Sequence, residues 1–414
     1  MTTTTTPTRA AEGRAPARAG SWPTEIRALL VATFLVRALG YSYPFLPYHL
    51  DELQLSTATI GKTLMVFGAG WLAGSVLWGW LADRIGRRTT LATAMGLAAV
   101  VLPLLAQAST LSTLTTAAFV AGIVYDAPRP VVTAAIADRY RDDASRASIN
   151  AARNFAVNTA AAAAGASGGL LADRIGIPAL LWANAAACAA CAVIAFTLVS
   201  PNSATPPAAR APQRDALRDR RLWLLLLTSL AALTACAAMF SSLPLLMARA
   251  GLSAADYGWA QTANAAAVLL LSPYLNRWMS RRAGRDRPMT GMLALSALIL
   301  GTSMASAAYA TSIPGFSLAA ALAVPGEIIA FIAAGDILAR ISPPGSHGLY
   351  AGIWGTTLAG AVVLAPTLAS WSLEHGGPPL NAAATLTAGV LGAALCWPLA
   401  ASVRRMQAPA TPAP

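Results

Sequence analysis

Six charged side chains fall inside long apolar stretches of the sequence. They are Arg37, Asp126, Arg129, Arg153, Glu327 and Asp336. A charge at the centre of a membrane-spanning helix costs about 2.5–3.5 kcal/mol, so such residues face a polar cavity or one another. Groups of this kind hold charged ligands and carry protons across membranes. The pattern therefore indicates a pathway for a small molecule or an ion through a membrane.

Two of the acids are candidates for taking up and releasing a proton. Glu327 has no basic residue within helical reach in its own stretch, and burial favours the neutral form of a carboxyl, as a proton carrier requires. Asp126 and Arg37 each lie near the middle of their stretch, so the two are expected to pair. A second interpretation stays open, in which Arg37, Arg129 and Arg153 form permanent ion pairs that only fix helix packing.

The composition predicts the elements that position these residues. Of 414 residues, 56% are hydrophobic and 11% are charged, whereas soluble domains carry about 25% charged residues. A spanning helix needs about 20 apolar residues, and twelve such stretches occur, at 24–48, 60–82, 89–108, 112–138, 149–171, 178–199, 222–247, 256–278, 288–308, 313–339, 349–371 and 378–400. We expect an all-α membrane protein of two six-helix halves, 23–200 and 222–401, with a cytoplasmic linker at 201–221 and cytoplasmic tails at 1–22 and 402–414.

The net charge of +12 reflects the orientation of the chain in the membrane rather than binding to nucleic acid. The arginines gather in alternate loops, as the positive-inside rule requires, so the linker and both termini are expected on the cytoplasmic side. The arginine-rich, lysine-poor usage suggests a bacterium, and therefore its cytoplasmic membrane. The four cysteines lie in apolar stretches without the spacing of a metal site, and we interpret them as packing residues.

The loop after the second stretch carries Gly79-Trp-Leu-Ala-Asp83-Arg84-Ile-Gly86-Arg87-Arg88. This string resembles the signature of the major facilitator superfamily, in which the acid helps to latch the two halves together on the cytoplasmic side. The resemblance implies a cytoplasmic gate, formed by Gly79, Asp83, Arg84, Gly86, Arg87 and Arg88. Asp138 and Asp336, near the same surface, are expected to add gate salt bridges.

A second resemblance covers the fourth and fifth stretches. Tyr125-Asp126-Ala-Pro-Arg129-Pro, then Arg153, Asn158 and the glycines of Gly165-x-x-Gly168-Gly169, are similar to a bacterial drug-efflux branch of the superfamily. The resemblance adds Asn158 to the candidate substrate and proton residues Glu327, Asp126, Arg37, Arg129 and Arg153. An arginine typical of proton antiporters is replaced by an apolar residue near Ala118, and a customary proline is Ser167.

The sequence thus predicts a secondary transporter and not an enzyme, working by alternating access. The main expectation is proton-coupled efflux of a drug-like or secondary-metabolite molecule, and the alternative is a proton-coupled importer or a facilitator of a small metabolite. Ser56 to Thr63 ends like a phosphate-binding loop but lacks its first glycine and faces outward, so no nucleotide or other cofactor is expected. The expected partners are a small-molecule substrate and the lipid bilayer, with the chain acting as a monomer.

Overall fold

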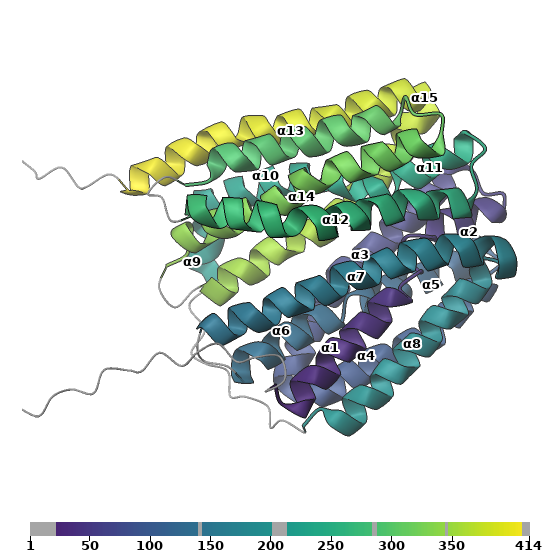
Figure 1. The fold of residues 1–414 in the computed structure, drawn as a ribbon, viewed down its shortest axis with the longest axis horizontal. Helices are drawn as coiled ribbons and strands as arrows, with labels where there is room; N and C mark the ends of the chain where they lie inside the picture. Colours follow the sequence, from purple (N-terminus) through teal and green to yellow (C-terminus); the bar gives the residue numbers. More distant parts are fainter. Residues whose placement is uncertain (1–21, 140–142, 201–212, 284–287, 344–346, 408–414) are drawn as a thin grey trace, which may run out of the picture.

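The structure, a computed structural model, describes residues 22–139, 143–200, 213–283, 288–343 and 347–407. Over these ranges every regular element is a helix (Figure 1). The elements are α1 (Thr24–Ala38), α2 (Leu46–Glu52), α3 (Thr57–Ile85), α4 (Arg87–Gln107), α5 (Leu111–Tyr125), α6 (Pro128–Arg139), α7 (Asp143–Ile175), α8 (Ile177–Leu198), α9 (Gln213–Arg218), α10 (Arg220–Ala237), the 3₁₀ turn η2 (Ala238–Phe240), α11 (Ser242–Arg249), α12 (Ala254–Ala283), α13 (Thr290–Ala307), α14 (Ile313–Ile341) and α15 (His347–Gln407).

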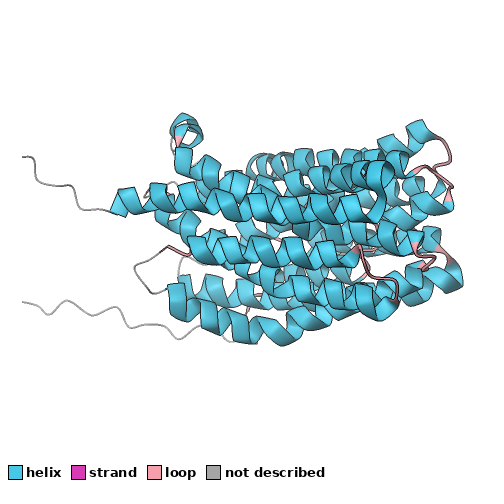
Figure 2. Ribbon diagram, turned by 90° about the horizontal axis from the view of Figure 1, so that it is seen from above, coloured by secondary structure: helices cyan, strands magenta, loops and turns pink. Residues whose placement is uncertain are grey.

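Within the described residues, the helices form a single bundle, and the chain passes from one end of the bundle to the other twelve times. We call each passage a crossing. Three crossings are composite, namely α1 with α2, α5 with α6, and α10 with η2 and α11, while α15 makes two crossings and bends back at Gly377, where φ is 63°. Figure 2 shows the helices running in one general direction with their loops at the two ends. Among the described residues, eight helices are long and apolar enough to span a membrane. In Figure 1 the helices from α1 to α8 form one group and those from α9 to α15 lie beside them.

The first, fourth and seventh crossings are each interrupted. The first breaks between Ala38 and Leu46, around Gly40 and Pro44. The fourth breaks after Tyr125, ahead of a proline that starts α6. Proline cannot donate the helical hydrogen bond and disfavours a helical residue before it, which explains these positions. The seventh breaks at η2. Within the expected linker at 201–221, α9 occupies Gln213–Arg218 and α10 begins at Arg220; residues 201–212 lie outside the described residues.

Glycines set how closely the two halves approach on the side away from the linker, which we call the outer side. A Cβ atom added at Gly258 of α12 would lie 2.6 Å from the Cα of Gly169 of α7. One added at Gly68 of α3 would lie 2.6 Å from the carbonyl oxygen of Val362 of α15. Small residues let membrane helices pack backbone against backbone. These contacts seal the outer side, and we call them the glycine seam.

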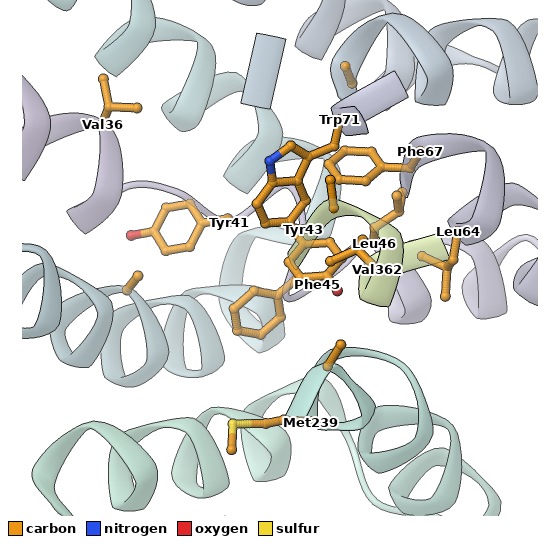
Figure 3. Packing of buried hydrophobic residues seen from close by; sticks show 14 of the residues in the cluster. Val36, Tyr41, Tyr43, Phe45, Leu46, Leu64, Phe67, Trp71, Met239 and Val362 are labelled. Carbon is orange, nitrogen blue, oxygen red and sulfur yellow. The ribbon is translucent and has the colours of Figure 1, made fainter. Parts of the chain in front are cut away.

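Aromatic rings fill the space behind this seam (Figure 3). Tyr43, in the break between α1 and α2, stacks on Phe67 at 5.5 Å and meets Phe240 of the other half at 5.0 Å. Phe45 and Tyr48 both contact Tyr257 of α12, at centroid distances of 5.7 and 5.6 Å. The aromatic side chains of this region therefore pack against one another across the halves.

One charged side chain also links the two halves on the outer side. Arg249, at the end of α11, donates a hydrogen bond to the carbonyl of Leu373 at 2.9 Å and one to the hydroxyl of Thr57 on α3 at 3.3 Å. On the linker side, by contrast, a Cβ added at Gly335, Gly352 or Gly355 would meet nothing within 4 Å. The contacts described here between the two halves therefore lie on the outer side.

Asp219 anchors the start of the second half. Its carboxylate caps α10 by accepting from the backbone N–H of Arg221 at 2.9 Å, and it accepts the hydroxyl of Tyr350 on α15 at 3.0 Å. Partial burial acts to raise the pKa of Asp219, but the hydrogen bonds from Arg221 and Tyr350 outweigh it and lower the pKa. Because the folded-state pKa is lowered, this stabilisation is complete above the ordinary carboxyl pKa and is lost as the pH falls through the folded-state value.

We predict that Gly169→Val opens the outer side, because its side chain would be forced into the backbone of α12 at Gly258. The measurement is the distance between spin labels at Ser109 and Thr311, in outer loops of the two halves, in a chain whose four cysteines are replaced by alanine. The labels should move apart in the variant. Gly96→Val is the matched control, because an added Cβ there meets nothing within 4 Å. An unchanged distance in Gly169→Val would contradict the role of the seam.

We predict that Asp219→Ala lowers thermal stability at neutral pH by about 0.5–2 kcal/mol, the usual cost of a lost helix cap. Asp219→Asn keeps a capping oxygen and should cost less. The measurement is thermal unfolding of the purified chain in detergent. Equal melting temperatures for wild type and Asp219→Ala at neutral pH would rule out the anchoring role.

Candidate functional site

Arg37 and Asp126 meet where the first and fourth crossings are broken. Arg37 lies in the last turn of α1, and Asp126 is the C-cap of α5. A terminal nitrogen of Arg37 donates to Asp126 Oδ1, and the other donates to the hydroxyl of Tyr125 at 3.1 Å. The guanidinium carbon also lies 5.0 Å from the Tyr125 ring centre. The structure thus brings together the two residues that were expected to pair.

A second arginine shares the same carboxylate. Arg129 Nε lies 2.8 Å from Asp126 Oδ2, and the Arg129 backbone N–H donates to the Asp126 carbonyl at 3.0 Å. Asp126 is therefore held by guanidiniums from two helices, and its side chain is only 7% exposed. The Arg129 side chain is 48% exposed. A charged group with such access at this depth faces water rather than lipid.

Arg153 of α7 joins this group through a threonine. Its Nη1 donates to the hydroxyl of Thr133 on α6 at 2.6 Å, and that hydroxyl donates to the Arg129 carbonyl at 2.7 Å. Arg153 lies within electrostatic range of Arg129, Asp126 and Arg37. We call these four charged residues the arginine cluster. It holds three guanidiniums and one carboxylate, and so carries a surplus of two positive charges.

Glu327 lies on the opposite half, on α14. Pro325 precedes it and cannot donate a helical hydrogen bond, and Gly326 packs so closely on α13 that an added Cβ would lie 2.8 Å from Leu300 Cγ. The Glu327 carboxyl makes no hydrogen bond or ion pair with any residue that the structure describes. The Cys236 thiol of α10 is within its electrostatic range.

The accessible face of α14 leads from Glu327 toward the linker side. Phe331 and Gly335 follow at intervals of four residues and are exposed, so they share one helix face with Glu327. The Phe331 ring meets the ring of Trp354 on α15 at 6.1 Å. Arg129 and Thr133 have the same four-residue spacing on α6. Glu327, Phe331 and Gly335 therefore share one face of α14, and Arg129 and Thr133 share one face of α6.

Of the expected gate residues, Arg84, Arg88 and Asp336 contact residues of their own half. Arg84 lies over the ring of Trp80 at 4.3 Å, and Arg88 lies over Phe196 at 4.4 Å, both within the first half. Asp336 pairs with Arg340 at 3.0 Å and accepts a backbone N–H of α13 at 3.2 Å, within the second half.

The remaining gate residues are placed as follows. Gly86 has φ 83° and joins α3 to α4 in a turn that favours glycine, Gly79 borders open space, and Arg87 is buried. The side chains of Asp83 and Asp138 lie outside the described residues.

Sequence analysis missed one residue of the site and left another without a contact. Thr133 links Arg129 to Arg153 and was not singled out, although its position four residues after Arg129 puts both on one helix face. Asn158 was expected at the site through the resemblance. It is half-buried on α7 and makes no hydrogen bond to a described residue.

Among known protein families, the profile of the Major Facilitator Superfamily matches residues 29–255 of this chain. No curated protein sequence matches the chain. A POT family transporter solved with a thioalcohol-conjugated peptide has a TM-score of 0.77 at 13% identity, over 94% of this chain and 99% of that one.

Two further solved structures are similar. A peptide transporter POT has a TM-score of 0.74 at 16% identity, over 94% of this chain and 96% of that one. The nucleoside transporter NupG has a TM-score of 0.68 at 16% identity, over 91% and 99%. At these identities the likeness shows the fold, and it confirms the expected all-α membrane architecture.

We predict that Asp126→Asn destabilises the chain more than the double change Arg37→Gln with Asp126→Asn. Removing one partner of a buried pair leaves an uncompensated charge and lowers the free energy of unfolding by about 3 kcal/mol. Removing both partners leaves no such charge from the pair and lowers it less. Thermal unfolding in detergent of wild type, both single variants and the double variant gives the coupling between the residues. Strictly additive effects would show that the pair contributes no interaction of its own.

Proposed function

The chain belongs to the major facilitator superfamily, and we propose that it is a proton-coupled transporter that takes a small metabolite into the cell, with Glu327 as the proton site. One observation carries the proposal. The half-buried Glu327 carboxyl has no ionic or hydrogen-bonding partner among the described residues, on a helix that Pro325 weakens beside it.

Solvation explains why such a carboxyl can move protons. A carboxylate in a low-dielectric site without a counter-ion is costly, so the protonated form is favoured there. Contact with water on either side lets the group exchange its proton with that compartment. Asp126 is less suited to this role, because two guanidiniums stabilise its charged form.

Uptake is favoured over drug efflux by two observations. The similar structures are peptide and nucleoside transporters, which favours the small-metabolite alternative. The aromatic residues that an apolar drug site would use, such as Tyr43, Trp71 and Tyr125, pack against each other at 4.8–5.7 Å. Efflux of a drug-like molecule in exchange for protons is therefore the weaker candidate function.

The location follows from the loop charges. The arginines of the loops on the linker side support an orientation with both termini in the cytoplasm. The arginine-rich composition supports the cytoplasmic membrane of a bacterium. A single chain forms both halves of the pathway, so the proposed functional unit is a monomer.

We predict that Glu327→Gln abolishes proton movement coupled to substrate, because glutamine cannot carry a proton. The chain is reconstituted in liposomes that enclose a pH-sensitive dye, and amino acids, dipeptides, nucleosides, organic acids and cationic dyes are added one at a time. In wild type at least one compound should acidify the lumen. Glu327→Asp should retain part of the signal.

The matched control is Glu374→Gln, which neutralises an exposed acid just before the bend of α15 at Gly377. This variant should acidify the lumen as wild type does. Acidification that persists in Glu327→Gln would overturn the assignment of the proton site. Alkalinisation of the lumen when a cationic dye enters would instead support antiport and drug efflux.

A further inference from the structure

We propose that the substrate is a small organic anion whose charged group binds between Arg129 and Arg153, and that its charge makes the proton move in the same direction. This inference rests on the proposed function, because it names the substrate class of the same cavity. It concerns the arginine cluster, which belongs to the first half, whereas Glu327 belongs to the second.

Charge balance is the first step of the argument. The cluster has three guanidiniums and a single carboxylate, that of Asp126, which is shared by Arg37 and Arg129. Neither Arg129 nor Arg153 pairs with a second acid among the described residues. Two positive charges inside a membrane protein are therefore left without counter-ions, at a depth where unpaired charge is costly. An anion in the cavity removes that cost.

Donor geometry is the second step. A guanidinium has five N–H donors in a planar fork that fits a carboxylate or a phosphate. Arg129 uses Nε on Asp126, and Arg153 uses Nη1 on Thr133, so each keeps donors to spare. The Thr133 hydroxyl fixes Arg153 next to the helical turn that carries Arg129, because it bonds both residues.

The helix break strengthens this anion site. The α6 helix begins at Pro128, one residue before Arg129, so the positive end of its dipole lies inside the membrane at the cluster. A helix N-terminus alone would not define a site. Here it adds to two guanidiniums that already converge from α6 and α7.

Linkage between the two faces then fixes the direction of coupling. A bound anion repels a charged Glu327 and so favours its protonated form, and by reciprocity a protonated Glu327 favours the anion. Proton and substrate therefore bind together and cross together. A cationic substrate would have the opposite linkage and would exchange with the proton. A monoanion with one proton also crosses as a neutral pair, so an inside-negative potential does not oppose its entry.

The test is ligand binding to the purified full-length chain in detergent, where no gradient exists. The probes are succinate, pyruvate and glycerol phosphate, with succinamide as an uncharged analogue and tetraphenylphosphonium as a cation. At least one anion should raise the melting temperature, and it should bind about tenfold more tightly at pH 6 than at pH 8, a coupling within the usual range. Glu327→Gln should remove this pH dependence and keep the binding.

Variants separate the anion site from general effects. Arg153→Gln should weaken anion binding at least about tenfold, the loss expected for a charge-assisted hydrogen bond, and Arg153→Lys and Thr133→Val should weaken it less. Arg174→Gln is the matched control, because it removes the same charge from the exposed outer end of α7. Melting without ligand shows which variants fold.

Two results would overturn the anion proposal. One is binding of succinamide or tetraphenylphosphonium as tightly as the best anion, and the other is the lack of any anion binding that Arg153→Gln weakens. A different result would overturn the proposed function alone. In that result, anions bind and Arg153→Gln weakens their binding, but the Glu327→Gln variant still couples proton flux to substrate in liposomes.

Discussion

The ion pair of Arg37 with Asp126 is the interaction on which the first half depends. Each residue lies where its crossing is broken, so the pair joins two places at which backbone groups leave the helical pattern. Membrane-spanning backbone tolerates such breaks only where protein or a cavity satisfies its polar groups. The pair therefore keeps two interrupted helices together and positions the neighbouring arginines toward the cavity.

The sequence contained enough information for the fold and for the charged residues, because both follow from composition along a single helix. Apolar length predicted the twelve crossings, and charge inside them identified Arg37, Asp126, Arg129, Arg153 and Glu327. The break in the fourth crossing was harder to predict, since a proline such as Pro128 is tolerated in a continuous membrane helix when neighbours compensate. Thr133 was missed because its role exists only through Arg153, a residue on another helix whose approach no local pattern reveals.

The charges described in the two halves differ in sign. The first half carries the arginine cluster with its surplus of positive charge, and the second carries Glu327 without a counter-ion among the described residues. In the proposed function, the charge of the cargo, rather than its shape, determines how proton and cargo are coupled. The same twelve-helix scaffold with an acidic surplus in the first half would couple in the opposite sense, without a change in fold.

The glycine seam has a consequence for the energy of opening. Where Gly169 meets Gly258, the contact consists of backbone whose hydrogen bonds are already made within each helix. Separating these surfaces therefore breaks few hydrogen bonds and mainly exchanges helix contacts for lipid or water contacts, with Arg249 as the one charged link described there. The resistance to separation therefore comes mainly from the aromatic rings that pack across the halves beside the seam, such as Tyr43 against Phe240 and Phe45 against Tyr257.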